Sequence, residues 1–435
     1  MTCDLLVKNV RCWNRSANAF ESVNLAVKDG RVAAVLPRSH GDEVSAKTVV
    51  EGAGRCALPG FIDLHVHLRD PGYTYKEDIL SGCRAAAAGG VTSVFCMPNT
   101  KPVCDSAEVL SYILDKAKSA DARVFPVAAI TEGMLSEKVC DLTALRDAGA
   151  AAFSDDGKPV MTAALLREAM KIAAENDLLI MSHCEDMSLA KGGAINEGMI
   201  ARKLGLKGIP NLAEDLCIER DIMLAEETGA RLHICHVSTK GGLACIRRAK
   251  ERGVRVTAET CPHYFSLTES DVIFYGANAK MNPPLRTRDD LEAVIEAIRD
   301  GTIDAISTDH APHSAEEKGN DLAKALNGII GMQTSFAVSY TNLVQAGHIT
   351  LSRLIELMSY NPAKITGLDK LGLGMLEAGS AADFSLVTLG CEDTISPDEL
   401  AGKSANTPFA GMTFSARIDA TFMGGRQVYA NKKYH

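Results

Sequence analysis

Residues 61–68, with the sequence FIDLHVHL, decide how the chain folds, because they combine a strand pattern with two histidines. Apolar residues dominate the run, which is typical of a strand buried on both faces of a parallel sheet. His65 and His67 are two residues apart, so in a strand their side chains point to the same face. The run therefore predicts a buried strand that presents two imidazoles together at its carboxyl end.

The same strand pattern recurs along the middle of the chain. Between the apolar runs lie longer segments with helical patterns rich in Ala, Leu, Glu and Lys, such as 163–175 and 289–299. The eight runs are at 61–68, 92–97, 123–130, 151–154, 178–182, 231–237, 254–260 and 304–308. Strand–helix alternation repeated eight times predicts an α/β fold, with a parallel sheet closed into a (β/α)8 TIM barrel.

The two ends of the chain show hairpin patterns instead. The predicted terminal strands are at 5–10, 22–27, 31–35, 382–389, 417–423 and 427–429. We expect both ends to combine into one small β-sandwich domain. The expected domain bounds are 1–56 for its N-terminal part, 57–365 for the barrel and 366–435 for its C-terminal part.

Composition excludes several classes of protein. The 435 residues are 46% hydrophobic and 23% charged, and they carry a formal net charge of −9 without a prominent run of Lys or Arg. This balance disfavours a nucleic-acid surface or an anionic membrane surface. No stretch reaches the roughly 18 apolar residues of a membrane helix, and the N-terminus lacks the pattern of a secretory signal.

The cysteines indicate a reducing compartment. There are 13, an odd number, and no two have the CxxC spacing. A chain of this length has no need of disulfides, so buried reduced thiols are the better interpretation. We therefore expect a cytoplasmic protein with no nucleic-acid and no membrane partner.

Side chains that bind metals gather at the ends of the predicted strands. The six are His65, His67, Asp156, His183, His236 and Asp309. The carboxyl ends of barrel strands meet at the face where barrel active sites lie. Imidazoles and carboxylates together suit zinc and related metals, and buried carboxylates need such a partner. For the HxH pair alone, two hydrogen-bonded core histidines are an alternative of about equal weight.

Five motifs, in order along the whole chain, resemble those of bacterial dihydroorotases in the amidohydrolase superfamily. They are DLHVHLRDPG at 63–72, MPNT at 97–100, FSDDG at 153–157, MNPPLR at 281–286 and TDHAPH at 308–313 with Lys318 after it. The resemblance extends to the expected composite terminal domain.

The resemblance implies two Zn²⁺ ions per chain. His65 and His67 would bind the first metal, and His183 and His236 the second. Asp156 would bridge the metals, being preferred over Asp155 by the family spacing of 27 residues to His183. Asp309 would be both a ligand and the catalytic general base.

One departure from the superfamily pattern favours the dihydroorotase subclass. Hydantoinases, allantoinases and dihydropyrimidinases bridge their metals with a carboxylated lysine on the fourth strand, but 151–156 contains none. Lys158 lies between Gly157 and Pro159, so we expect it on a solvated loop. A carboxylate bridge holds two cations close in the same way.

Arg69 and Asn99 point to an anionic substrate. Arg69 lies two residues beyond His67, and its planar fork matches a carboxylate. The alternative is a surface ion pair of Arg69 with Asp70 or Glu77. Asn99 can add an amide donor to the same carboxylate, which neutral hydantoins lack.

The family pattern adds three more expected substrate contacts. Asn282 and His313 would face the substrate, although His313 is alternatively a loop residue that caps local backbone. Gly328 would offer a backbone N–H. Here it follows Asn327, where close relatives are expected to have an aromatic residue.

The expected activity is the reversible hydrolysis of (S)-dihydroorotate to N-carbamoyl-L-aspartate in pyrimidine (UMP) synthesis. A hydroxide bridged by the two zinc ions would attack the ring carbonyl, and Asp309 would pass its proton to the departing nitrogen. A hydantoinase- or allantoinase-like enzyme is the nearest alternative. A non-catalytic partner of aspartate transcarbamoylase is the alternative from another class. A homodimer and a complex with that transcarbamoylase both stay open as assemblies of an active enzyme.

Overall fold

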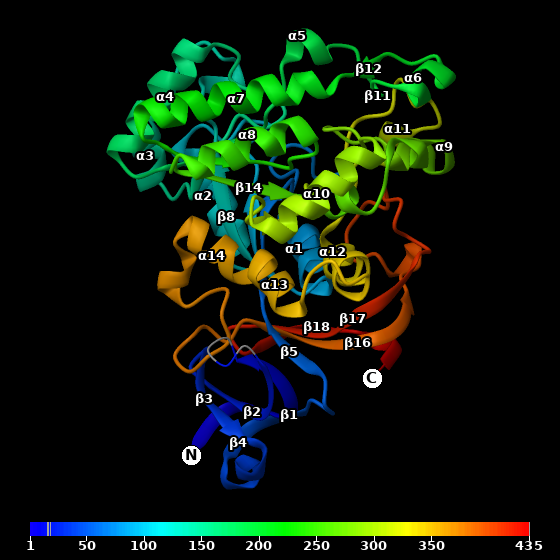
Figure 1. The fold of residues 1–435 in the computed structure, drawn as a ribbon. Helices are drawn as coiled ribbons and strands as arrows, with labels where there is room; N and C mark the ends of the chain where they lie inside the picture. Colours follow the sequence, from blue (N-terminus) through cyan, green and yellow to red (C-terminus); the bar gives the residue numbers. More distant parts are fainter. Residues whose placement is uncertain (15–16, 18, 435) are drawn as a thin grey trace.

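The barrel predicted for the middle of the chain is present in the computed structural model, which describes residues 1–14, 17 and 19–434 (Figure 1). Its eight parallel strands hydrogen-bond in chain order. They are β6 (Phe61–Val66), β7 (Val91–Cys96), β8 (Arg123–Ala128), β9 (Ala152–Phe153), β10 (Leu179–Ser182), β13 (Arg231–Ile234), β14 (Val256–Thr260) and β15 (Ala305–Ile306).

The first and last barrel strands meet just beyond their carboxyl ends. Val66 forms a parallel bridge with His310, and the N–H of His67 donates to the carbonyl of His310 at 2.8 Å. The buried carboxylate of Asp63 accepts the backbone N–H of Thr308 at 3.0 Å and its hydroxyl at 2.6 Å. These contacts close the sheet into the predicted barrel.

Two of the barrel strands have only two residues each, far fewer than the sequence pattern predicts. The runs at 151–154 and 304–308 form the two-residue strands β9 and β15. In both places the chain leaves the strand ladder early. After β15 the backbone of Asp309 takes the left-handed conformation, with φ of 47°.

Helices cover the outside of the barrel, and α4, α7, α8 and α10 lie side by side along it (Figure 1). The α-helices are α1 (Ile79–Ala88), α2 (Ala107–Ala117), α3 (Leu142–Asp147), α4 (Ala163–Glu175), α5 (Met187–Ala190), α6 (Met199–Leu204), α7 (Asn211–Thr228), α8 (Lys240–Glu251), α9 (Val272–Tyr275), α10 (Arg288–Asp300), α11 (Ala315–Lys318), α12 (Ser335–Ser339), α13 (Leu351–Ile355) and α14 (Asn361–Thr366). Their ends follow local chemistry: α10 begins with a Thr287–Asp290 capping box and ends at Gly301, whose φ is 86°.

The ends of the chain combine into a second eight-stranded sheet. Its strands are β1 (Thr2–Asn14), β2 (Ala19–Lys28), β3 (Arg31–Pro37), β4 (Ser45–Glu51), β5 (Cys56–Pro59), β16 (Phe384–Thr394), β17 (Thr413–Met423) and β18 (Arg426–Ala430). The join is the antiparallel pairing of β5 with β16. One apolar cluster contains side chains from both ends, including Leu25 and the stacked rings of Phe384 and Phe422.

The terminal sheet is fastened to the barrel by apolar and ionic contacts. Figure 1 shows β16–β18 between the barrel helices α12 and α13 and the strands β1–β4. Ile418 on β17 belongs to the apolar cluster of the barrel. Arg123 on β8 donates two hydrogen bonds to the buried carboxylate of Asp383, at 2.8 and 3.1 Å.

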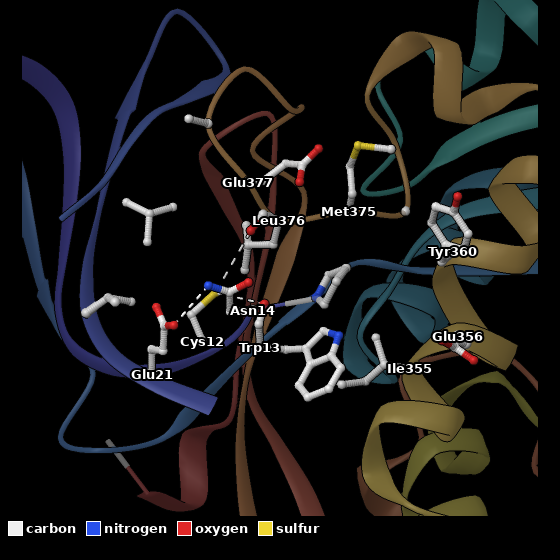
Figure 2. Close-up of a pocket in the computed structure, with 15 residues that line it drawn as sticks. Cys12, Trp13, Asn14, Glu21, Ile355, Glu356, Tyr360, Met375, Leu376 and Glu377 are labelled. Carbon is white, nitrogen blue, oxygen red and sulfur yellow. Dashed lines mark hydrogen bonds between the residues drawn. The ribbon is translucent and has the colours of Figure 1, made fainter. Parts of the chain in front are cut away.

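A cavity of about 280 Å³ lies where the terminal sheet meets the barrel. Trp13, Tyr360 and Met375 are among its lining residues (Figure 2). No histidine and no aspartate is among the lining residues, so this cavity does not hold the predicted ligand cluster.

Two expectations from composition concern the whole chain. All 13 cysteines are unpaired, and all but Cys245 and Cys391 are buried. No helix in the described part of the chain combines the length and apolar character needed to cross a membrane.

Candidate active site

The six predicted ligand side chains converge at the carboxyl end of the barrel. Around Asp156 Oδ1, the nearest ring nitrogens are at 3.2 Å for His65, 3.5 Å for His183 and 3.6 Å for His236. His67 Nε2 lies 3.5 Å from Asp156 Oδ2 and 3.1 Å from Asp309 Oδ1. Asp156 is therefore central to the cluster, and Asp309 lies on the side of the HxH pair.

The structure separates the two neighbouring aspartates after β9. Asp155 points away from the histidines: its Oδ1 accepts the N–H of Ile130 at 2.8 Å and that of Thr131 at 3.1 Å. Asp156 points into the cluster. Lys158 is exposed, as expected for a residue on a solvated loop.

Polar side chains orient three of the imidazoles from behind. Asn99 Oδ1 lies 2.9 Å from His67 Nδ1, while His67 Nε2 lies 3.1 Å from Asp309 Oδ1. Glu259 Oε1 lies 3.4 Å from His65 Nδ1. Glu185 Oε2 lies 3.5 Å from His183 Nε2. Such outer partners fix the ring that a metal site needs.

The cluster fits divalent metal ions. His65 Nε2, Asp156 Oδ1 and His236 Nδ1 are buried atoms without a hydrogen-bond partner, and unpaired polar atoms are costly in a protein interior. The donor atoms form two overlapping groups, each within 4.8 Å: His65, Asp156 and His236 in one, and His65, His67 and Asp309 in the other. Imidazole with carboxylate is a donor set that zinc and its neighbours prefer.

The close packing of carboxylates and imidazoles shifts the pKa values of both kinds of group. Burial opposes ionisation of Asp156, but the adjacent imidazoles outweigh it and hold the carboxyl pKa well below its usual range. Burial also opposes ionisation of Asp309, yet the contact with His67 lowers its pKa to about 2. For His183, burial is outweighed by Asp156 and Glu185, which raise its pKa to about 10. The carboxylates are thus charged and attract a cation.

Three site residues have strained backbones. The φ angles of His236, Asp309 and Arg69 are 37°, 47° and 60°, in the left-handed region that residues with a Cβ rarely adopt. Each such residue costs about 1–3 kcal/mol, and such strain clusters at functional sites. All three residues follow barrel strands, and their side chains line the same cavity.

The cluster forms one wall of a cavity of about 250 Å³. The cavity is lined by His67, Arg69, Asn99, Asp156, Gly157, His183, His236, Asn282, Asp309, Ala311, His313, Leu326, Asn327 and Gly328. All five residues predicted to contact substrate are in this set. Of the six predicted ligands only His65, which is fully buried behind the wall, is not.

Arg69 enters the cavity without a carboxylate partner among the described residues. Its Nε donates to the carbonyl of Pro312 at 3.2 Å, and its Nη2 is 3.5 Å from His313 Nε2. Asp70 instead accepts from Tyr112 at 2.8 Å and from Lys116. Glu77 is fully buried and accepts from Ser81. The structure therefore shows neither alternative surface pair, Arg69–Asp70 or Arg69–Glu77.

His313 and Asn282 are held by partners at the rim. His313 Nε2 donates to the carbonyl of Asn327 at 2.8 Å, and burial together with the nearby Arg69 and Lys76 lowers its pKa to about 3. This imidazole is therefore neutral. Asn282 Nδ2 donates to Glu185 Oε2 at 2.9 Å.

Gly328 lines the cavity. The sequence led us to expect a free backbone N–H at this residue, but the N–H already has a partner. That N–H donates to the carbonyl of Lys280 at 3.0 Å. The φ of Gly328 is 134°, and a Cβ here would lie 2.6 Å from the Cβ of Ala311, so only glycine fits. Tight packing of the rim, which no local pattern reveals, therefore uses this donor within the protein.

Sequence reasoning missed two acidic residues that support the histidines. Glu259 is fully buried and also lies 3.2 Å from His233 Nε2. A charged residue inside the apolar run 254–260 was the available signal. Glu185 follows His183 by two residues, a spacing that places both on one face of an extended chain.

Comparison with known proteins places this geometry in a family. A family model described as Dihydro-orotase-like matches residues 54–242. The dihydroorotase of Geobacter metallireducens is 49% identical over 428 residues, which cover 98% of this chain and 99% of the relative. The chain belongs to the dihydroorotase family. The dihydroorotase of Acetivibrio thermocellus is 44% identical over 429 residues, with 98% and 99% of the two chains covered.

A solved structure relates the dihydroorotase-family chain to a hydantoinase fold. The L-hydantoinase (dihydropyrimidinase) from Arthrobacter aurescens superposes with a TM-score of 0.87 at 26% identity, covering 98% of this chain and 96% of that chain. The shared architecture spans both the barrel and the terminal sheet. The identity is far below that of the dihydroorotases.

Replacing Glu259 by glutamine keeps its size but removes the charge behind His65. We predict that Glu259→Gln weakens the binding of divalent metal about 10- to 100-fold, as loss of an outer partner typically does. Competition with a chromophoric chelator measures this affinity. Glu251→Gln, at an exposed position of α8, is the matched control. Equal affinity in both variants would rule out the supporting role of Glu259.

Proposed function

We propose that the protein is a dihydroorotase that hydrolyses (S)-dihydroorotate reversibly to N-carbamoyl-L-aspartate in pyrimidine synthesis. The observation that carries the proposal is a single cavity whose lining combines two kinds of group. One is the cluster of imidazoles and carboxylates, and the other is Arg69, which has no carboxylate partner among the described residues. A cyclic amide that carries a carboxylate complements both groups.

Two zinc ions are the cofactor we propose. His65 and His67 would hold one ion, His183 and His236 the other, Asp156 would bridge them, and Asp309 would complete the first site. When bound, the ions would polarise the ring carbonyl and increase the acidity of the attacking water.

Asp309 is the proposed general base and acid. Its carboxylate lies at the cavity wall beside His67, charged and buried. As the oxygen of water forms its bond to the ring carbonyl carbon, Asp309 takes the proton of that water. When the carbon–nitrogen bond breaks, Asp309 gives the proton to the departing ring nitrogen. A positioned group of this kind contributes about 10²–10⁴-fold to the rate.

Arg69 would fix the orientation of the ring. Its guanidinium offers a planar pair of donors to the substrate carboxylate. Asn99 lines the same cavity, and its Nδ2, which makes only 3.4 Å contacts with Asp156, would add a third donor. Asn282 and neutral His313 would contact the ring from the rim, and Gly328 would shape the wall by its backbone. Holding the ring in one pose reduces the entropy that the reaction must lose.

The hydantoinase-like alternative rests on the shared fold. The described residues offer no lysine at the fourth strand in place of Asp156, and Arg69 has no function towards a neutral ring. A scaffold without catalysis would not need the strained ligand geometry found here. We therefore favour dihydroorotase over both alternatives, with 57–365 as the catalytic domain and 1–56 with 366–435 as the composite terminal domain.

A homodimer is the assembly we propose, with aspartate transcarbamoylase as an alternative partner. Leu212, Leu216 and Met223 on α7 are about half exposed or more. Apolar side chains along one helix favour contact with another protein surface. Sedimentation velocity of the chain, alone and with aspartate transcarbamoylase, distinguishes a dimer, a complex and a monomer.

The direct test of function is hydrolysis of dihydroorotate by zinc-reconstituted protein. We expect turnover with dihydroorotate, little with hydantoin or allantoin, and loss of activity after chelator treatment that added zinc restores. Metal analysis of the same sample should give about two zinc per chain. Preference for a neutral ring, or full activity without metal, would contradict the proposal.

Asp309→Asn removes the proposed base but keeps the size of the side chain. We expect kcat to fall by about 10²–10⁴-fold while the metal content stays near that of the unchanged protein. Asp321→Asn, at an exposed position on the same side of the barrel, is the control. Near-normal kcat in Asp309→Asn would exclude its role as the base.

Arg69→Met removes the fork that faces the substrate carboxylate. Charge-assisted hydrogen bonds contribute about 1.5–3 kcal/mol, so KM for dihydroorotate should rise about 10- to 100-fold. Arg69→Lys should recover only part of the loss, because an ammonium lacks the planar fork. Arg84→Met, exposed on α1, is the control. A KM unaffected by Arg69→Met would place the substrate carboxylate elsewhere.

A further inference from the structure

Lys318 is a buried cation that the proposed reaction does not use. It is the last residue of α11, and only 4% of its surface is exposed. Among the described residues its ammonium contacts no carboxylate, and burying an uncompensated charge is costly. Burial and the nearby Lys280 accordingly lower the pKa of Lys318 to about 7. A residue kept at such a cost needs a structural reason.

The ammonium of Lys318 is surrounded by backbone carbonyls. It donates to Gly328 at 2.8 Å, to Leu326 at 2.9 Å and to Lys280 at 3.1 Å. An ammonium has three N–H donors, so each of them has one carbonyl. Hydrogen bonds from a charged donor are about twice as strong as neutral ones.

Those carbonyls belong to two different walls of the substrate cavity. Residues 326–328 line it directly, and Lys280 precedes Asn282 by two residues. The two walls also touch each other, because the N–H of Gly328 donates to the carbonyl of Lys280 at 3.0 Å. Lys318 therefore bonds to both segments, 280–282 and 326–328, at the place where they contact each other.

The same contact region also orients His313. His313 Nε2 donates to the carbonyl of Asn327, the residue between Leu326 and Gly328, whose carbonyls accept from Lys318. The short helix that carries Lys318 begins directly after His313, with Ser314 as its N-cap. A displacement of 326–328 would therefore change the position of the imidazole.

The segment 326–328 depends on outside donors for its shape. Gly328 has a φ of 134°, and its carbonyl is also bound by Asn406 Nδ2 at 3.0 Å. No helix or strand includes these residues. Side chains from elsewhere in the fold, Lys318 and Asn406, supply the bonds that secondary structure would otherwise provide.

We propose that Lys318 is a positioning residue for substrate binding, whose ammonium holds the 280–282 and 326–328 walls so that Asn282, His313 and the Asn327–Gly328 backbone face the ring of the substrate. The proposal rests on the proposed dihydroorotase function. It assigns Lys318 no contact with substrate or with metal.

Kinetics of Lys318→Met and Lys318→Arg test the proposal. Because misplacement by about 1 Å can cost about 10²-fold, we expect KM for dihydroorotate to rise about 10- to 100-fold in Lys318→Met. We expect kcat and metal content close to those of the unchanged protein. Lys318→Arg keeps the charge but not the three-donor geometry, so its KM should lie between the two. Lys324→Met, whose side chain is 86% exposed nearby, is the matched control.

Amide hydrogen exchange supplies a readout that does not need activity. The N–H groups of Leu326 and Gly328 are bonded to the carbonyls of Glu317 and Lys280, and both should exchange faster in the Lys318 variants. If Lys318→Met fails to fold, Lys318→Arg carries both measurements.

Three outcomes would overturn the positioning role: unchanged KM with unchanged exchange, a fall in kcat at constant KM, or loss of metal. If the unchanged protein does not hydrolyse dihydroorotate, the proposed function fails separately. Amide exchange at Leu326 and Gly328 then still tests the positioning role of Lys318. Unchanged exchange rates in the Lys318 variants overturn that role, and faster rates support it.

Discussion

The pairing of β6 with the segment after β15 is the contact on which the site depends. Asp63 accepts both the N–H and the hydroxyl of Thr308, and the N–H of His67 donates to the carbonyl of His310. Asp309 lies between these two anchors, so its carboxylate is held 3.1 Å from His67 Nε2. A slip of one residue in this pairing would turn Asp309 to the opposite face. Closure of the barrel and assembly of the site are therefore one event.

Charge within the cavity is arranged in two zones despite the net charge of −9. The deep wall collects carboxylates among imidazoles, an environment for metal cations. The rim carries Arg69, with the buried Lys76 and Lys318 behind it. An anionic substrate is thus attracted by a few local cations rather than by the field of the whole molecule, and its carboxylate and its reactive carbonyl are drawn to different zones.

Rigidity at the site comes from bonds outside the secondary structure. Arg69, His236 and Asp309 hold left-handed backbones, which persist only where the surroundings over-determine them. Asn99, Glu185 and Glu259 orient imidazoles from behind. Lys318 and Asn406 hold the rim. Buried side chains of this kind explain how loops at a barrel mouth keep a defined geometry without strands or helices of their own.

The sequence by itself determined the barrel, the terminal sheet and the set of residues that meet at its mouth. The signals for them are local: apolar runs, the helical segments between them, and the two-residue spacing of His65 and His67. In a strand, such spacing alone determines to which face each side chain points. Only the tertiary structure decided between Asp155 and Asp156 on physical grounds. It also paired the N–H of Gly328 with a carbonyl, and it placed Glu259 beside His65 and Lys318 beside Lys280. The reason is that a side chain at a strand end points where the backbone turns, and that turn is set by contacts between residues far apart in the chain.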